Sequence, residues 1–444
     1  MKQISLFKPE DLPSRILYKK LFENLPHLSW DQKERGGRPP FSRDFLLKAL
    51  IYKGLRRIHS LTDLIFELKN NPSVLAACTG DALSRIPSVE RISSFLRNTP
   101  NQRLAKVRDT LVDILIQEGA ITAKIVALDS CPIPANVKEN NLKTSVKDRF
   151  DKNRRPKGDP EAGLGIMIHY PRPFKKEICY FWGYRNHVIV DAETELSLWE
   201  KTLLANKSEM RQAIPMLKEL INRHPSLKIE VVLGDAMYDT EDILKFIIKE
   251  LQAKAGIPRN PRRQEKKEGF HVNKNNVYCP ADIAMFRKGK MTVAGITYIQ
   301  YACPLYWSNK IQQRYLFCPA NHPKFFSQKG CNYLIRLTPS IREEIDYGSE
   351  EFKSLYNKRT SIERSFSRLL SIAMQNPTTV GLNATQNHCT IAHITSLLVA
   401  LTAYRSGQKD KIRFIKSFVP DLPPLIVPLV KLESMAMVSG AGGR

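Results

Sequence analysis

Apolar residues recur at helical spacing through the first part of the chain. The pattern predicts helices over 42–58, 60–70, 88–99 and 101–119. Ser60 and Asp63 resemble a capping box at the start of the second helix. We interpret residues 1–120 as an N-terminal helical domain. Two roles stay open for it: a helix-turn-helix that reads DNA with residues 88–97, or a bundle used for dimerisation.

The pattern changes at residue 121. A short apolar run over 123–130 predicts a buried strand that ends at Asp129. Two strands around a turn, a helix, and a strand-turn-helix unit are predicted over 181–205, 208–224 and 227–254. The strand of the last unit ends at Asp235. Antiparallel strands followed by alternating helices and strands are typical of an α/β domain with a mixed sheet.

The texture changes again after residue 257. Residues 258–330 are rich in Tyr, Thr, Ile, Cys and Pro, and strand-like alternation over 291–304 and 314–319 predicts a β-rich insertion. The α/β pattern resumes at 331–346, and long helices are predicted over 351–375 and 384–404. We therefore expect an α/β domain made of 121–257 and 331–405, interrupted by this insertion and followed by a tail over 406–444.

The charge balance narrows the choice of partner. The chain holds 69 Lys and Arg against 44 Asp and Glu, a formal net charge of +25. Such an excess attracts nucleic acid or an anionic membrane. The most apolar run, 391–404, is too short to span a bilayer, and the N-terminus lacks the apolar core of a signal peptide. We expect no membrane partner and a cytoplasmic location. The basic runs 143–157 and 259–267 are either solvated loops or phosphate contacts.

The cysteines leave two interpretations open. Eight are scattered along the chain, which favours reduced thiols over a disulfide framework. Half of them lie at positions Cys279, Cys303, Cys318 and Cys331. These four thiols are candidates for a structural Zn²⁺ site. No Cys-x2-Cys pair is present, so buried free cysteines are the favoured alternative.

Three acids are candidates for catalysis. Asp129 and Asp235 end predicted strands, where sites form in open α/β sheets, and Glu363 lies on the helix predicted over 351–375. Three oxygen donors suit two Mg²⁺ or Mn²⁺ ions, which together clamp the attacking and leaving oxygens of a phosphoryl transfer. The alternatives are an aspartate that caps a turn and an Arg–Glu surface pair on a helix.

Tyr356 and Arg359 precede Glu363 at offsets that put all three on one face of a single helix. We expect the planar Arg359 guanidinium to face a phosphate. Tyr356 would donate its hydroxyl or stack on a base.

These segments resemble bacterial insertion-sequence transposases of the DDE type. The first acid of that family lies in a segment similar to IVALDSCPIPA, which matches Asp129, and the second in a segment similar to GDAMYDT, which matches Asp235. The third lies in the pattern Tyr-x2-Arg-x3-Glu-x6-Lys, whose first three positions match Tyr356, Arg359 and Glu363. The fourth is Leu370 here, and the candidates to replace the missing lysine at a DNA phosphate are Arg364 and Arg368.

The resemblance implies a ribonuclease H-like catalytic domain in which Asp129, Asp235 and Glu363 bind two Mg²⁺ or Mn²⁺ ions. It implies metal-dependent cleavage of double-stranded DNA at the terminal inverted repeats of the element, and strand transfer into target DNA. It also implies a homodimer that brings two ends together, and an insertion that contacts the transposon end. The alternatives are a ribonuclease H-like nuclease that cuts without joining, and an inactive, domesticated transposase that only binds DNA. An RNA-binding protein is disfavoured, because the chain lacks an aromatic RNP pattern.

Overall fold

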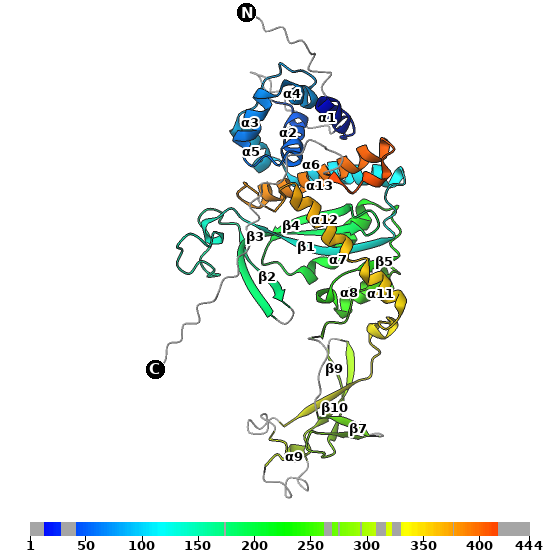
Figure 1. The fold of residues 1–444 in the computed structure, drawn as a ribbon. Helices are drawn as coiled ribbons and strands as arrows, with labels where there is room; N and C mark the ends of the chain where they lie inside the picture. The colour runs from blue at the N-terminus through cyan, green and yellow to red at the C-terminus, as the bar shows by residue number, and fades with distance from the viewer. Residues whose placement is uncertain are drawn as a thin grey trace, which may run out of the picture. The chain divides into compact units, whose positions relative to one another are not determined.

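The computed structural model (Figure 1) consists of two compact units. The first unit comprises Met1–Ile229 and Lys358–Arg444, and the second comprises Glu230–Asn357. The structure describes residues 13–27, 41–172, 175–261, 269–273, 276–293, 295–307, 317–321, 330–375 and 377–415.

The first unit begins with helices. They are α1 (Pro13–Glu23), α2 (Arg43–Leu55), α3 (Leu61–Asn70), α4 (Pro72–Thr79), α5 (Val89–Asn98) and α6 (Asn101–Gln117). The four predicted helices are confirmed, and so is the capping box, in which Ser60 Oγ accepts from the Asp63 amide at 3.0 Å. Helix α4 was not predicted. Asn71 and Pro72 look like loop residues in sequence, but they serve as the N-cap and first residue of α4.

Four antiparallel strands form the sheet of this unit: β1 (Ile125–Pro134), β2 (Gly163–Arg172), β3 (Lys175–Asp191) and β4 (Ser197–Leu204). The long strand β3 pairs with each of the other three. The two strands predicted around the turn at 191–195 are confirmed as β3 and β4.

The predicted end of β1 is wrong. Asp129 lies in the middle of the strand, opposite Val188, and pairing continues until Pro134 meets Gly183. A Cβ atom at position 183 would lie 2.3 Å from the Ile133 carbonyl oxygen, so only glycine allows this close approach. The apolar run over 123–130 suggested a strand end in the sequence, whereas Gly183 lets the pairing continue to Pro134.

Helices cover both faces of this sheet. Helix α7 (Glu209–Arg223) lies on one face, where Glu219 accepts from the Trp199 indole of β4 at 3.3 Å. Helix α13 (Leu382–Arg405) lies on the other, where His393 Nε2 is 3.0 Å from Asn186 Oδ1 of β3. The run 391–404 thus lies in a buried helix, as predicted. No helix in the described part of the chain is long and apolar enough to cross a membrane.

A buried carboxylate, that of Glu200 on β4, joins these layers. Its Oε1 accepts from Arg108 of α6 at 2.7 Å and from Thr390 of α13 at 2.8 Å. Its Oε2 accepts from Asn186 of β3 at 2.8 Å. Arg108 is only 1% exposed and also donates to Asp109. The polar groups satisfy one another inside the unit, as burial of charge requires.

The second unit contains a parallel strand pair, β5 (Val231–Leu233) and β6 (Lys254–Gly256). The connection between them contains the short helix η3 (Ala236–Tyr238), α8 (Glu241–Lys245) and the π-helical turn η4 (Phe246–Glu250). Later helical segments are η6 (Ile341–Glu344) and α11 (Glu350–Asn357). The predicted strand-turn-helix unit is confirmed.

The β-rich segment of this unit forms two small sheets. The first sheet pairs β7 (His271–Asn273) with β8 (Asn276–Tyr278). The second sheet consists of β9 (Phe286–Val293), β10 (Ile296–Ala302) and β11 (Asn332–Arg336), with β10 in the middle. The short helix α9 (Pro304–Trp307) follows β10. Two expectations are corrected. The single strand predicted over 291–304 is a hairpin that turns at Gly295, where φ is +76°. Residues 331–336 do not resume the α/β pattern, because β11 pairs with β10.

Two other predictions on this part of the chain have different outcomes. Of the strand predicted over 314–319, residues 314–316 lie outside the described residues, and 317–319 are not in a strand.

Arg336, at the end of β11, donates to both carboxylate oxygens of Glu241 on α8, at 2.9 and 2.6 Å. This bidentate pair connects the β-rich segment to the parallel pair within the second unit. The predicted mixed α/β class, with N-terminal helices and a β-rich insertion, is confirmed.

We expect Arg108→Met to destabilise the first unit by about 3–5 kcal/mol, because it leaves the buried Glu200 carboxylate without its counter-charge. Urea unfolding followed by tryptophan fluorescence measures the change. The matched control is Lys106→Met on the same helix, at an exposed position, which should change stability by less than about 0.5 kcal/mol. Equal effects of the two substitutions would show that the buried pair is not important.

Candidate active site

Two of the three predicted acids lie in the first unit and meet one cation. Arg359 Nη2 donates to Oε1 of Glu363 at 2.6 Å, and its Nη1 lies 3.8 Å from Oδ2 of Asp129. The Arg359 side chain is 18% exposed, and Glu363 is 53% exposed. An ordinary surface pair on a helix does not include an acid from a strand. The contacts therefore bring β1 and the Glu363 helix together around one guanidinium group.

Asp129 faces the side of the sheet that carries this helix. It lies opposite Val188 of β3, which in turn lies opposite Glu200 of β4. Residues directly opposite one another share a face, so Asp129 belongs to the row that contains the buried Glu200. The other Asp129 oxygen, Oδ1, accepts from the Ser130 amide at 2.7 Å.

The predicted helix over 351–375 is two helices. Helix α11 ends at Asn357, and α12 runs from Thr360 to Ser371. The prediction that Tyr356, Arg359 and Glu363 share one face of one helix is therefore wrong. Tyr356 belongs to α11 in the second unit, where its ring stacks on Phe352 with 6.4 Å between centroids. The break was not visible in the sequence, because NKRT contains no Pro or Gly.

Arg364 and Arg368, the predicted replacements for the missing lysine, both contact Glu195. Arg364 Nε donates to Glu195 Oε1 at 2.6 Å, and Arg368 donates to Oε2. Arg413 lies 3.6 Å from the same carboxylate. Glu195 is buried and occupies the turn between β3 and β4 with a left-handed φ of +62°. In this arrangement Arg364 and Arg368 hold α12 against the β3–β4 turn.

The third acid, Asp235, lies in the second unit directly after β5. Its Oδ1 accepts from the Met237 amide at 2.8 Å, so it caps the short helix η3 (Ala236–Tyr238). The sequence analysis gave a turn-capping aspartate as the alternative to a metal ligand, and this contact of Asp235 is such a cap. A carboxylate has lone pairs beyond those used by one cap, so this contact leaves a metal role possible.

The donor chemistry suits a hard cation, although the described residues do not include a formed metal site. In the part of the chain covered by the structure, no group of three or more His, Cys, Asp or Glu side chains is arranged to hold a metal. Arg359 supplies the positive charge between Asp129 and Glu363. Carboxylate oxygens of this kind suit Mg²⁺ or Mn²⁺ better than zinc.

A basic loop in the first unit exposes most of its charge. Residues 143–157 form turns without regular structure, as predicted, and six of the seven basic side chains are exposed. The exception is Arg149, which donates to the Thr144 carbonyl at 2.6 Å. Its own carbonyl accepts from the Trp182 indole at 2.7 Å. These contacts order the loop and leave its other cations at the surface.

The second unit has a basic surface that was not predicted. Strand β9 is at one edge of its sheet and exposes Arg287, Lys288 and Lys290. Three basic residues within RKGK were a sufficient pattern to identify it in the sequence. Of the predicted basic run 259–267, residues 262–267 lie outside the described part of the chain.

Comparison with known proteins identifies one family. A family model described as "Transposase DDE domain" matches residues 166–398, more than half of the chain. The matched range contains Asp235 and Glu363 and begins after Asp129. No curated protein matches the chain.

Solved structures give weak similarities. A piggyBac transposase synaptic complex with hairpin DNA is 12% identical, with 94% of this chain and 84% of that chain covered and a TM-score of 0.38. A Mos1 mariner paired end complex with Mn is 13% identical, with 79% and 83% covered and a TM-score of 0.18. TM-scores this low do not establish a shared fold.

We expect Glu195→Gln to loosen α12, because its arginines lose their buried counter-charge; the cost should be about 1–3 kcal/mol. Hydrogen exchange of the amides of residues 360–371 measures the effect and should become faster. Glu193→Gln, at an exposed position in the same turn, is the matched control. Unchanged exchange in the Glu195 variant would mean that α12 is held by apolar packing alone.

Proposed function

The chain belongs to the family of transposase DDE domains, and on this premise we propose that it cleaves and joins DNA at the ends of its own mobile element. The observation that carries the proposal is the pair of carboxylates, from β1 and α12, that share Arg359. An ion pair near the surface contributes little to stability, so stability alone does not explain two carboxylates around one arginine. Two carboxylates do suit a site that binds hard cations next to a phosphate.

We assign Asp129, Asp235 and Glu363 as ligands of two Mg²⁺ or Mn²⁺ ions. The fit rests on oxygen donor chemistry and on Arg359, a cation already lying between two of the acids. When bound, such ions supply charge neutralisation at the phosphate and activation of the attacking oxygen.

Arg359 has a second role in this proposal. Its guanidinium would leave Glu363 and bind a non-bridging phosphate oxygen, with the planar, bidentate geometry that arginine favours. Tyr356 is assigned to the DNA next to the scissile bond, as a hydroxyl donor or a stacking ring. Arg364 and Arg368 are proposed to bind DNA phosphates only after a phosphate replaces the Glu195 carboxylate as their partner.

The reaction would begin with attack of water on the phosphodiester at the element end, which leaves a DNA 3′-hydroxyl. That hydroxyl would then attack a phosphodiester of the target and expel a second 3′-oxygen. Each attack forms one P–O bond and breaks another, so no external energy source is needed. The strand succession, antiparallel strands followed by a helix-linked parallel pair, supports the ribonuclease H-like assignment.

The DNA partner is proposed to be double-stranded, with the terminal inverted repeats as the specific ligand and a homodimer holding two ends. The exposed cations of residues 143–157 and of β9 would follow the phosphate backbone. A protein that neutralises many phosphates loses affinity steeply as salt rises.

We expect Asp129→Asn, Asp235→Asn and Glu363→Gln each to reduce cleavage by about 10³-fold or more, because each substitution removes an anionic ligand and several kcal/mol of transition-state stabilisation. The substrate is DNA flanking the gene, searched for inverted repeats. Reactions are run with Mg²⁺, with Mn²⁺ and with EDTA. Asp242→Asn, an exposed acid in the first turn of α8, is the control and should retain activity.

The products distinguish the alternatives. Metal-dependent 3′-hydroxyl ends that become joined to a plasmid support the transposase. Cut ends that are never joined indicate a nuclease. Repeat binding without cleavage, unaffected by the three substitutions, would indicate an inactive DNA-binding protein and refute the catalytic assignment.

A further inference from the structure

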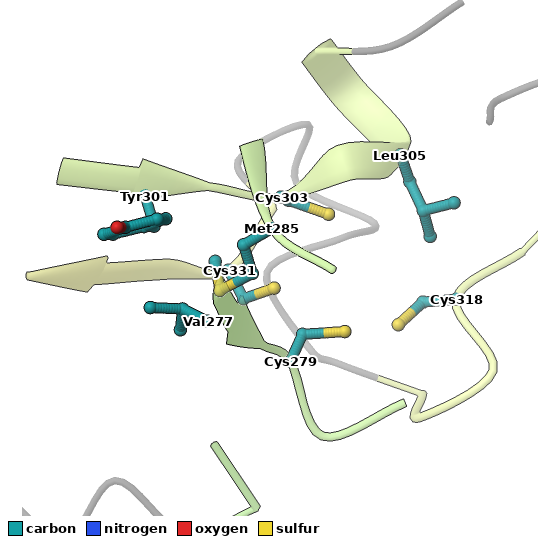
Figure 2. Packing of buried hydrophobic residues seen from close by; sticks show 8 residues of the cluster. All are labelled: Val277, Cys279, Met285, Tyr301, Cys303, Leu305, Cys318 and Cys331. Carbon is teal, nitrogen blue, oxygen red and sulfur yellow. The ribbon is translucent and has the colours of Figure 1, made fainter. Parts of the chain in front are cut away.

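Four cysteines of the second unit meet in one small buried cluster. Figure 2 shows Cys279, Cys303, Cys318 and Cys331 there, together with Val277, Met285, Tyr301 and Leu305. Half of the buried residues in this cluster are thus thiols. All eight cysteines of the chain are free of disulfides. The β-rich segment that surrounds them is small, and its strands β7 and β9 are largely exposed.

Two of the four cysteines lie at the start of matched turns. Cys279 begins the sequence CPAD and Cys318 begins CPAN. In each turn the amide of the fourth residue donates a hydrogen bond to the cysteine carbonyl. The distance is 2.8 Å from Asp282 to Cys279 and 2.9 Å from Asn321 to Cys318. Asp282 and Asn321 both adopt a left-handed backbone, with φ of +56° and +47°. Proline at the second position favours such turns. The chain therefore presents two thiols in the same local geometry.

The other two cysteines lie on neighbouring strands. Ala302 of β10 pairs with Asn332 of β11 in antiparallel register. Cys303 follows Ala302 and Cys331 precedes Asn332, so these two thiols are cross-strand neighbours one step beyond the last pair. Cys331 lies in the same buried cluster as Cys279 and Cys303, and the three thiols interact with one another there. Figure 2 shows the Cys318 sulfur directed toward Cys279.

Backbone amides also reach the sulfur atoms. The Ala281 amide interacts favourably with the Cys279 thiolate and the Leu305 amide with the Cys303 thiolate, each from two residues beyond its cysteine. Proline occupies the intervening position and has no N–H group. Amide donors of this kind orient and stabilise thiolates that bind metals.

We propose that Cys279, Cys303, Cys318 and Cys331 bind one structural Zn²⁺ ion through four thiolates. Zn–S bonds of about 2.3 Å in tetrahedral geometry place the sulfur atoms about 3.8 Å apart. In the described arrangement the thiols pack together in one buried cluster and do not form a metal site. Binding would replace these contacts, close Cys318 onto the other three, and release four protons.

The need for such an ion follows from the size of the apolar core. The cluster has only eight buried residues, four of them cysteines, and small cores of this kind are commonly stabilised by a metal or a disulfide. Four sulfur ligands in tetrahedral geometry select zinc or iron over harder cations. A disulfide framework is the other way to connect four cysteines, and it is testable.

The test measures metal in the full chain, purified under reducing conditions without chelator. Inductively coupled plasma mass spectrometry should find about one zinc per chain. Cys279→Ser and Cys318→Ser should each lower that content at least about 5-fold. The matched control is Cys179→Ser, a half-buried thiol on β3 of the first unit, which should leave the zinc content unchanged.

A second measurement does not depend on variants that fold. Wild-type protein reconstituted with Co²⁺ should show the intense sulfur-to-cobalt charge-transfer absorption of a four-thiolate site. Absence of this absorption together with absence of zinc would overturn the proposal. So would iron in place of zinc, or an intact mass lower by the hydrogens lost in two disulfides. The Asp129→Asn variant should keep its zinc, so failure of this proposal and failure of the catalytic proposal are distinguishable.

Discussion

The first unit depends on burial of one carboxylate. Glu200 is 5% exposed and is held by groups from α6, β3 and α13. An uncompensated charge at that depth costs several kcal/mol, so the three elements are fixed by the same requirement. Because Asp129 lies in the same cross-strand row as Glu200, this network also determines which helices the catalytic candidate faces.

A second buried acid, Glu195, has a related role for α12. Its strained turn and its arginine partners hold the helix that carries Glu363. Two buried carboxylates, those of Glu200 and Glu195, therefore stabilise the first unit through their arginine partners. Arg364 and Arg368, which a DNA-binding site could use for phosphates, stabilise the scaffold instead, whereas Arg359 contacts two acids of the proposed site, Asp129 and Glu363. A structural role for Arg364 and Arg368 accounts for their presence whether or not they replace the missing lysine.

Much of this arrangement was predictable from periodicity, but the turns and breaks were not. Helices with long apolar patterns, such as α6 and α13, were identified, and Ser60 and Thr240 behave as ordinary caps. The failures share a cause. Gly183 lets β1 pair as far as Pro134, and Gly295 divides one predicted strand into two. The break before α12 has no breaker residue at all. Tertiary context decided each of these, and local sequence carried little information about it.

The cysteines illustrate how the choice of pattern determines a prediction. Judged by Cys-x2-Cys spacing, the four thiols of the second unit form no metal motif. The repeated unit is instead Cys-Pro-Ala followed by Asp or Asn, two residues that tolerate a left-handed backbone. That repeat fixes the direction of two sulfurs, and strand register fixes the other two. Metal ligands that are far apart in sequence can therefore be positioned as firmly as those of a Cys-x2-Cys motif, provided that a turn or a strand pairing fixes the backbone at each of them.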